Sequence, residues 1–385
     1  MRVILLSISD ISRDWRVRRH AQLLADRGHD VRTVGLRNES ALPWQAAEID
    51  LPAWSASEKV QQAAQLLSVR LRRDRAADVY WASPRYQSLF RAAKATGPAD
   101  LFVANDWNTL PVAARLAREH RAKYAYDTHE YAVEESADRP KWRLVWPPFL
   151  RALEGDLIGG ATWVSTVSDG IADLLRGDYT LEVRPTVIRN VPGYREMPYR
   201  EPAEPLTVLF HGGLLRDRGL EPLLASVALW RAGRRLVVRG SGPSDYVDHL
   251  RSLVAGAGIA DRVAFEAPVP PGEVVAAANR TADVGIHPMP SLTNQTRFAL
   301  PNKLFEYTMA GLAVCVLAGS EMARVVTESG NGVLLDACTP ESIARTLNDL
   351  DLPQVAELKR ASLKAAHQLS WESEQQRMVD LYDRV

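Results

Sequence analysis

The feature that most constrains the fold is an alternation of short β-branched runs with longer amphipathic segments, which occurs in two series along the chain. This pattern is typical of parallel sheets whose strands are joined by crossover helices. Residues 192–205 separate the two series, and they contain four prolines and no hydrophobic period. Because proline fixes φ and removes an N–H donor, we expect a linker there. The sequence therefore predicts two doubly wound α/β domains.

The expected elements lie on both sides of this linker. For the first domain we predict strands at 2–9, 30–36, 100–104, 123–127 and 163–167, and helices at 15–27, 58–73, 108–120 and 169–176. For the second domain we predict strands at 207–211, 235–239, 262–266, 283–287, 313–317 and 332–335. Its helices are expected at 220–231, 246–256, 272–279, 303–310, 321–328 and 340–350. A chain of 385 residues has the length of two domains.

Composition excludes several classes of protein. Lys+Arg and Asp+Glu each total 47, so no net positive charge attracts nucleic acid. Cys315 and Cys338 are too few to cross-link a chain of this length, which favours a reducing cytoplasm. They also lie far from any histidine cluster, so we expect no metal site. No stretch is long and apolar enough to span a bilayer, and we expect a protein that is not integral to a membrane.

The end of the second domain's first strand has the features of a diphosphate site. Gly212 and Gly213 would let backbone N–H groups approach an anion, and the helix start that follows adds partial positive charge. Arg216 and Arg218 could add forked donors. The alternative is a tight turn with solvated arginines, which this stretch alone does not exclude. Gly240 begins a second glycine turn, for which a structural role is the simpler interpretation.

A second charged motif follows Pro301, which we expect in the first turn of a helix. Asn302, Lys303 and Glu306 would then lie on the first helical turns. Lys303 and Glu306 are i,i+3 neighbours, so a cation and a carboxylate are presented together at a helix N-terminus. Phosphates and sugar hydroxyls could use that pair, although an ordinary surface salt bridge is the alternative.

In the first domain, three ionisable residues lie at the carboxyl end of an expected strand. They are Asp127, His129 and Glu130. In doubly wound sheets this edge is where ligands bind. A lone histidine is more often a core residue, but the polar neighbours of His129 favour a functional role. Ser168 lacks the preceding glycine of a nucleophile elbow and is predicted to be a helix N-cap.

Together these motifs resemble the GT-B glycosyltransferases, specifically the large retaining family 4 (glycosyl transferases group 1). The resemblance covers nearly the whole chain and depends on the order and spacing of the motifs. They comprise Ser168 and the segments 14–17, 127–130, 189–192, 211–219, 300–311 and 370–382. The resemblance implies two Rossmann-like domains that face each other across a cleft. Residues 1–195 would bind the acceptor, 196–370 would bind a nucleotide sugar, and helix 371–385 would pack back onto the first domain.

The resemblance also implies roles for individual residues. Glu306 would accept hydrogen bonds from the ribose hydroxyls, Arg218 and Lys303 would neutralise the diphosphate, and His129 would touch the donor sugar near the reacting carbon. His129, Arg218 and Lys303 form the expected catalytic set. The other expected donor contacts are Gly212, Gly213, Gly240, Asn302 and Leu304, and the candidates on the acceptor side are Arg16, Asp106, Asp127 and Glu130. No metal and no cofactor is implied besides the donor substrate.

One position departs from the family pattern. Many members carry an acidic residue eight positions before the ribose-binding glutamate, and here that position is Phe298. The identity of the sugar is therefore open, with Thr293, Asn294, Gln295 and Thr296 as polar substitutes. UDP is favoured as the nucleotide by family habit alone. A sugar-nucleotide epimerase of the same double fold and an inactive nucleotide-sugar-binding subunit are the alternatives.

Residues 139–151 mix basic and aromatic side chains, as segments at membrane interfaces do. We favour a packing helix and loop within the first domain, because two adjacent prolines are expected to break any long amphipathic face. Peripheral contact with the inner face of a membrane is the less favoured alternative. The acceptor, beyond having a hydroxyl group, and the oligomeric state are not readable from the sequence.

Overall fold

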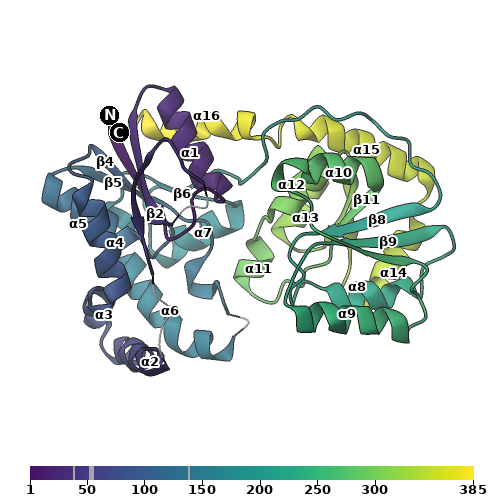
Figure 1. Cartoon of the computed structure of the whole chain (residues 1–385), viewed down its shortest axis with the longest axis horizontal. Coiled ribbons are helices and arrows are strands. Elements are labelled where there is room, and N and C mark those ends of the chain that lie inside the picture. The colour runs from purple at the N-terminus through teal and green to yellow at the C-terminus, as the bar shows by residue number, and fades with distance from the viewer. Residues whose placement is uncertain (38–39, 52–55, 138) are drawn as a thin grey trace. The chain divides into compact units, whose positions relative to one another are not determined.

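The computed structural model describes residues 1–37, 40–51, 56–137 and 139–385. The chain forms two compact units (Figure 1). The first consists of Met1–Ile188 and Gln375–Val385, and the second of Arg189–Glu374. Each unit has one parallel sheet covered by helices. The predicted doubly wound α/β class is therefore confirmed.

The described part of the first unit contains a seven-stranded sheet with the order β3-β2-β1-β4-β5-β6-β7. All of its strand pairs are parallel. The strands are Arg2–Leu6 (β1), Asp30–Leu36 (β2), Gln45–Ile49 (β3), Leu101–Asn105 (β4), Lys123–Asp127 (β5), Val164–Thr166 (β6) and Thr186–Val187 (β7). The strand order reverses between β1 and β4, which is where a doubly wound sheet binds its ligand.

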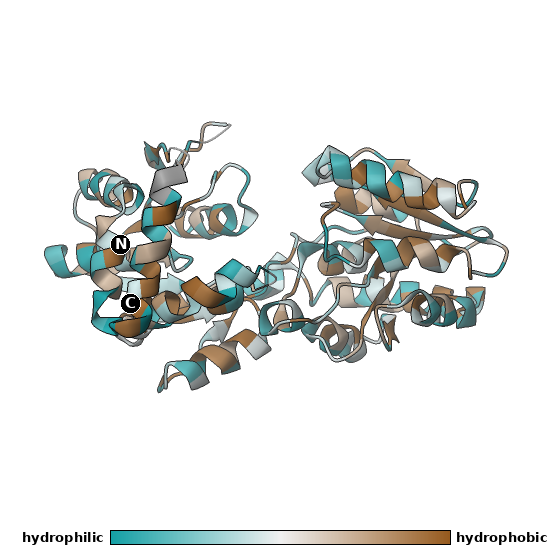
Figure 2. Cartoon of the chain, turned by 90° about the horizontal axis from the view of Figure 1, so that it is seen from below, coloured by the Kyte–Doolittle hydropathy of each residue, from teal (hydrophilic) through white to brown (hydrophobic). Residues whose placement is uncertain are grey.

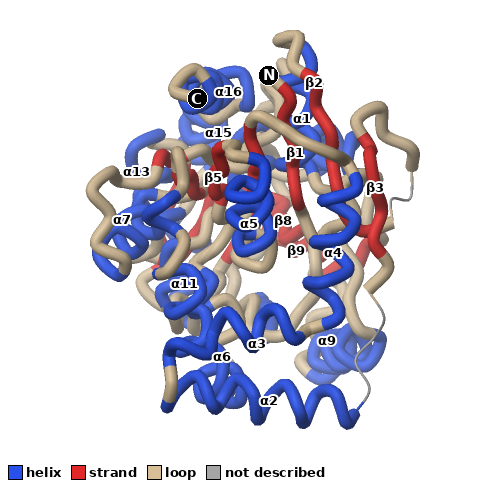
Figure 3. Tube along the Cα trace, turned by 90° about the vertical axis from the view of Figure 1, so that its left-hand side faces the viewer, coloured by secondary structure: helices blue, strands red, loops and turns tan. Residues whose placement is uncertain are grey.

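Eight α-helices surround this sheet in the described residues. They are Trp15–Asp26 (α1), Ala56–Leu71 (α2), Ala76–Ala82 (α3), Pro84–Ala95 (α4), Leu110–His120 (α5), Pro140–Gly155 (α6), Asp169–Asp178 (α7) and Trp371–Tyr382 (α16), of which the last enters this unit at Gln375. Figure 3 shows α2, α3 and α6 gathered at one end of the unit, and contacts join each pair of them. Short 3₁₀ turns lie at Arg73–Arg75, Ala132–Glu134 and Ile158–Gly160.

The second unit repeats this plan with a sheet of six described strands in the order β10-β9-β8-β11-β12-β13. Its strands are Leu206–His211 (β8), Arg234–Arg239 (β9), Val263–Glu266 (β10), Val284–His287 (β11), Ala313–Leu317 (β12) and Gly332–Leu335 (β13). Its helices are Leu220–Val227 (α8), Ser244–Gly256 (α9), Val274–Thr281 (α10, preceded by the 3₁₀ turn Pro271–Glu273), Asn294–Phe298 (α11), Asn302–Met309 (α12), Glu321–Ser329 (α13), Pro340–Asp349 (α14) and Leu352–Ala366 (α15).

The inner strands of the second unit, β8, β9, β11 and β12, are buried on both faces. Val208 and Phe210 belong to a core shared with α8, α9 and α14, whereas Leu209 between them belongs to a core shared with α10, α12 and α13. Figure 2 shows hydrophobic residues along these strands and a mixture of hydrophobic and hydrophilic residues on the helices. Burial on both faces explains why the strand sequences are continuous apolar runs without strict alternation.

The structure also differs from the expected elements. The edge strands β3 and β7 and the helices α3, α4, α11 and α15 were not predicted. Pro147 and Pro148 lie inside α6, which continues through them, so the expectation that they break this segment is wrong. Pro301 is the N-cap of α12, one position before the first turn where it was expected. Ser168 does cap α7, since its side chain accepts a hydrogen bond from the Ile171 N–H at 3.3 Å.

The segment suggested as a membrane contact packs its tryptophans within the first unit. Trp142 stacks on Trp146 with 4.9 Å between ring centroids, and its Nε1–H donates to the Val133 carbonyl at 3.2 Å. The side chain of Leu144 on the same helix is exposed. No helix within the described ranges is long and apolar enough to cross a bilayer.

Candidate active site

In the first unit, His129 lies between two carboxylates beyond the ends of β4 and β5. Its Nδ1 is 3.5 Å from Asp106 Oδ2, and its Nε2 is 3.5 Å from Asp127 Oδ2. Its backbone N–H donates to Asp106 Oδ1 at 3.4 Å. Burial lowers the pKa of His129, but the two carboxylates outweigh this effect and raise it to about 9. The side chain is therefore an imidazolium at neutral pH.

A buried ion pair fixes Asp127 in position. Arg16 binds it through two hydrogen bonds, Nε to Oδ2 at 2.8 Å and Nη2 to Oδ1 at 2.6 Å. Arg16 Nη1 also donates to the Ile188 carbonyl at 2.7 Å, and Ser165 Oγ donates to Asp127 Oδ1 at 2.6 Å. Burial raises the pKa of Asp127, yet the Arg16 guanidinium keeps it well below its ordinary value. Both side chains contact protein groups, and their expected role toward the acceptor stays a prediction.

A cavity of about 140 Å³ opens beside His129. Asp106, Trp107, Glu130 and Glu135 are among the residues that line it, so two of the expected acceptor-side carboxylates face this space. Asp106 has a φ of 66°, an uncommon conformation for a residue with a side chain. Burial raises the pKa of Asp106, and the His129 charge offsets part of this shift. A strained carboxylate beside an imidazolium is a frequent feature of functional sites.

Behind this cavity lies a buried tyrosine–glutamate network that the sequence did not reveal. Tyr126, which lines the cavity, donates its hydroxyl hydrogen to Glu154 Oε1 at 2.5 Å. Tyr179 donates to the other carboxylate oxygen of Glu154 at 2.7 Å. Burial raises the pKa of Glu154 to about 7 despite these two donors. Because Tyr126 lies in β5, these hydrogen bonds help to fix the end of the strand that precedes His129.

In the second unit, the two predicted glycine turns pack against each other. The Gly212 N–H donates to the Arg239 carbonyl, and the Leu214 N–H donates to the Ser241 carbonyl, both at 2.9 Å. A Cβ on Gly240 would lie 1.8 Å from the Gly212 carbonyl oxygen, so only glycine fits there. Gly212 has a φ of 109°, in the region that favours glycine. A Cβ on Gly213 would meet only the Leu215 side chain, at 3.6 Å, which leaves space over this turn.

Glu306 and Lys303 both lie in the first two turns of α12, next to the Gly212 turn. Glu306 Oε2 is 2.9 Å from His211 Nε2 at the end of β8. The Lys303 ammonium lies 4.3 Å from the centre of the Phe210 ring, and it would be 3.3 Å from a Cβ on Gly212. The other two predicted donor residues on this helix differ in burial: Asn302 is exposed and Leu304 is in the core. The glycine turn and the charged end of α12 are thus one site.

Positive charge is concentrated in this site. Burial and the Arg218 guanidinium lower the pKa of Lys303 to about 7, against the opposing effect of Glu306. Arg218 Nη1 donates to the Met289 sulfur at 3.1 Å. Burial also lowers the pKa of His287 well below its ordinary value, and the positive charges of Lys303 and Arg218 add to the shift. Burial and mutual repulsion disfavour the positive charges in this site. An anionic ligand would offset that repulsion, so the site is suited to one.

Sequence reasoning missed His211 and His287 as site residues, although both end a predicted strand. The position at the carboxyl end of a parallel strand could have identified them. In the described part of the chain, both ring nitrogens of His287 lack a hydrogen-bond partner. Among the polar substitutes near Phe298, Thr293 and Thr296 bind each other's backbone N–H groups in a capping box that starts α11.

No group of three or more His, Cys, Asp or Glu side chains that could hold a metal ion occurs within residues 1–37, 40–51, 56–137 and 139–385. The charged and polar groups described above differ between the two units. In the first unit these are an imidazolium and carboxylates. In the second they are cations, a carboxylate and open glycine backbone.

Comparison with known proteins agrees with this architecture. Residues 14–193 match the model of the glycosyl transferase 4-like domain, and residues 205–350 match that of the glycosyl transferases group 1. No curated protein sequence matches the chain.

Solved structures with the same fold cover the whole chain. Sucrose-phosphate synthase from Thermosynechococcus elongatus superposes with a TM-score of 0.74 at 18% identity, over 100% of this chain and 98% of that one. Anabaena HepE in complex with UDP-glucose gives a TM-score of 0.67 at 14% identity, over 100% of both chains. WaaG, a glycosyltransferase involved in lipopolysaccharide biosynthesis, gives 0.67 at 17% identity, over 98% of this chain and 99% of that one. The chain therefore belongs to the GT-B glycosyltransferases, with a glycosyl transferase 4-like domain followed by a domain of the glycosyl transferases group 1.

Proposed function

We propose that this protein transfers a sugar, with retention of anomeric configuration, from a UDP-sugar to a hydroxyl group of an acceptor. The observation that carries the proposal is the second unit's cation-rich site, where Lys303 and Arg218 adjoin the open glycine turn at Gly213. A nucleoside diphosphate would supply negative charge beside these two cations. HepE has been solved in complex with UDP, with UDP and glucose, and with UDP-glucose, which supports the choice of UDP.

In this proposal the second unit binds the nucleotide. The Glu306 carboxylate accepts hydrogen bonds from the ribose hydroxyls, and His211 Nε2 lies 2.9 Å from Glu306 Oε2. Lys303 and Arg218 lie against the diphosphate. Charge on the leaving diphosphate grows in the transition state, so fixed cations there lower the barrier more than they strengthen ground-state binding. No metal ion and no additional cofactor takes part.

The first unit handles the sugar and the acceptor. The His129 imidazolium donates a hydrogen bond to a hydroxyl of the transferred sugar and is kept charged by Asp106 and Asp127. Because Arg16 and Asp127 are buried, we assign them the role of positioning His129. Asp106 and Glu130 line the cavity beside it and are the residues that an acceptor hydroxyl would meet.

Replacement of Glu306 tests this proposal. Glu306→Ala should weaken binding of UDP by about 1.5–3 kcal/mol, the usual contribution of hydrogen bonds to a charged group. Isothermal titration calorimetry measures this as a rise in Kd of roughly 10- to 150-fold. Glu341→Ala is the matched control, since Glu341 is an exposed glutamate in the first turn of α14. Unchanged affinity in Glu306→Ala would refute the assignment of this carboxylate to the ribose.

The reaction itself is tested with the donor alone. A transferase should slowly release free sugar and UDP from UDP-glucose, whereas an epimerase would interconvert the sugar and an inactive binding subunit would do neither. Chromatography of the sugar products distinguishes the three outcomes.

A further inference from the structure

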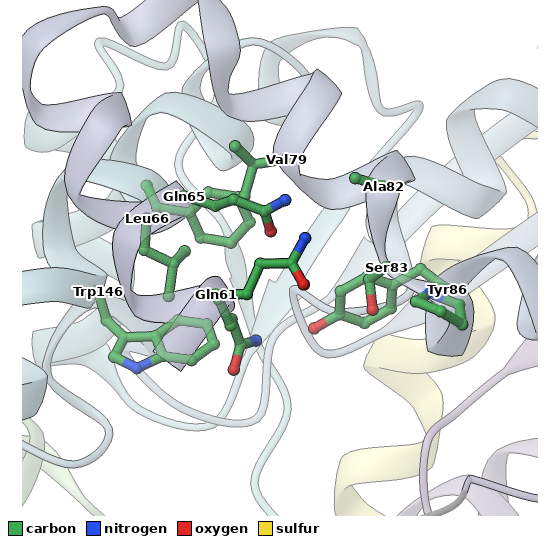
Figure 4. Close-up of a pocket in the computed structure, with 11 residues that line it drawn as sticks. Gln61, Gln65, Leu66, Val79, Ala82, Ser83, Tyr86 and Trp146 are labelled. Atoms are coloured by element: carbon green, nitrogen blue, oxygen red, sulfur yellow. The ribbon is translucent and has the colours of Figure 1, made fainter. Parts of the chain in front are cut away.

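The first unit contains a second cavity, among α2, α3, α4 and α6, with a volume of about 190 Å³ (Figure 4). A cavity of about 150 Å³ holds one benzene ring. This cavity therefore has room for a single six-membered ring. It is separate from the cavity beside His129, and no role has been assigned to it above.

The polar groups that line this cavity are neutral. Gln61, Gln62 and Gln65 extend from α2, and each amide offers both hydrogen-bond donors and an acceptor. In Figure 4 the amides of Gln61 and Gln65 lie around the same space as the side chains of Ser83 and Tyr86. Among the described residues that line the cavity, none has a charged side chain. This lining suits a ligand with hydroxyl groups and no net charge.

Ser83 provides an independent indication that a ligand is missing. It is the N-cap of α4, where a serine hydroxyl normally accepts a hydrogen bond from a backbone N–H of the first turn. Here the hydroxyl makes no such bond, and Oγ has no hydrogen-bond partner in the described part of the chain, although the residue is only 9% exposed. An unpaired buried hydroxyl is unfavourable. Because Ser83 lines the cavity, rotation about its Cα–Cβ bond would bring the hydroxyl to a ligand hydroxyl there, which would satisfy it.

Aromatic rings connect this cavity to the one beside His129. Tyr86, Trp146 and Phe149 line the first cavity, and their ring centroids lie 6.2, 5.8 and 6.1 Å from that of Trp107. Trp107 lines the cavity that contains His129. The two spaces are therefore neighbours within one unit, separated by one layer of aromatic side chains.

We propose that this second cavity binds one uncharged sugar ring of the acceptor, on the other side of Trp107 from the cavity beside His129. A pyranose has an apolar C–H face, which would lie against the aromatic rings, and a rim of hydroxyl groups, which would bind the amides and Ser83. A purely apolar ring would leave those polar groups unpaired, and an anionic ring would find no counter-charge. This inference rests on the proposed transferase function and specifies the chemistry of its acceptor.

The test measures binding of small probes to the full chain by saturation-transfer NMR. The probes are the methyl glycosides of glucose, galactose, mannose and N-acetylglucosamine, with methyl glucuronide as the anionic probe and phenol as the apolar one. We expect at least one neutral glycoside to bind. Gln65→Leu and Ser83→Ala should each weaken it about fivefold or more, the effect of one lost hydrogen bond.

A stability measurement and two control variants show whether a loss of binding is specific to the cavity. Ser83→Ala should not lower the thermal unfolding midpoint, because its hydroxyl caps no helix N–H and has no hydrogen bond to lose among the described residues. Gln87→Leu and Ser88→Ala, on α4 but outside the cavity lining, should bind the glycoside as the parental chain does. The inference is overturned if no neutral glycoside binds, if methyl glucuronide or phenol binds in its place, or if Gln65→Leu and Ser83→Ala bind it normally.

Calorimetry with UDP separates this inference from the proposed function. If UDP binds and Glu306→Ala weakens that binding, while no glycoside occupies the cavity, only the inference about the acceptor fails. If UDP binding is absent or does not depend on Glu306, the proposed function fails whatever the cavity binds.

Discussion

Lys303 should make the binding of a nucleotide sugar depend on pH. Burial and the Arg218 charge lower the pKa of Lys303 to about 7 from its ordinary value of 10.5. A bound diphosphate would place negative charge beside the ammonium group and raise its pKa again. The ligand therefore prefers the protonated protein, and by linkage its affinity must fall as the pH rises through the pKa of the free protein.

The magnitude follows from that pKa. Below about pH 7 Lys303 is already protonated in the free protein, and the affinity should be nearly constant. Above about pH 7, the binding affinity should fall tenfold per pH unit, which is about 1.4 kcal/mol, for as long as Lys303 stays protonated in the complex. Between about pH 7 and 8.5 the Kd should therefore rise roughly 16-fold, because half of Lys303 is already deprotonated at pH 7.

Calorimetry with UDP-glucose measures this dependence well, because a diphosphate esterified at both ends has no proton to lose in this range. Parallel titrations in two buffers with different ionisation enthalpies count the protons taken up on binding, which should approach one per complex above the pKa. Lys303→Met should bind more weakly and lose the pH dependence, whereas Lys303→Arg should stay charged throughout.

Arg216→Met serves as the matched control. Arg216 is a cation in the loop that follows β8, but it is exposed and its Nη2 lies 3.7 Å from Asp245 Oδ2. This variant should keep the pH dependence of the parental chain. A parental affinity that stays constant from about pH 6 to 8.5, or an equal slope in Lys303→Met, would show that Lys303 does not contact the diphosphate.

Two further predictions concern the first unit. His129→Ala should leave the affinity for UDP nearly unchanged in calorimetry and lower the transfer rate at least about tenfold, which corresponds to 1.4 kcal/mol of barrier. In the parental enzyme the transfer rate should fall as the pH rises past the His129 pKa of about 9. An unaltered transfer rate in the variant would contradict the proposed contact. Glu154 has a folded-state pKa of about 7 against an ordinary 4.5, so its stabilising contribution is complete below the lower value and is lost as the pH rises to the upper one. In urea unfolding, the free energy of unfolding of Glu154→Gln relative to that of the parental chain should therefore rise by about 3 kcal/mol between those two pH values and stay constant above them. A difference in unfolding free energy that is independent of pH would mean that Glu154 is ionised in the folded protein throughout.

The buried parallel strands were predictable because each is a continuous apolar run ended by a turn. The expected strands 30–36, 123–127 and 313–317 agree to the residue with β2, β5 and β12. The edge strand β3, whose sequence is QAAEI, was missed because it has one buried residue and no β-branched run. An edge strand is held by one neighbour, so its sequence is under weaker constraint.

The candidate site was predictable only in part, since a sequence shows which residues follow a strand but not which of them meet. Asp127 and His129 were identified from their position at a strand end. Their connection to Arg16, 111 positions from Asp127, depends on the packing of α1 against the sheet. Glu154 gave no signal either, because a glutamate in an amphipathic helix ordinarily points to solvent.

The path of the chain through the two units also determines the order in which they can be completed during synthesis. The second unit is one continuous stretch, whereas the first needs Gln375–Val385 as well as Met1–Ile188. In the finished first unit the Tyr382 hydroxyl contacts His20, and Lys123 Nζ donates to the Val385 carbonyl at 2.5 Å. These contacts of the first unit can therefore form only after the whole second unit has been synthesised.

Until then the nascent first unit lacks α16, whose Met378, Leu381 and Tyr382 are buried against it. The apolar surface that this helix covers stays available to chaperones, or to other nascent chains, for the time needed to translate the second unit. The part of the protein made first is thus the part finished last.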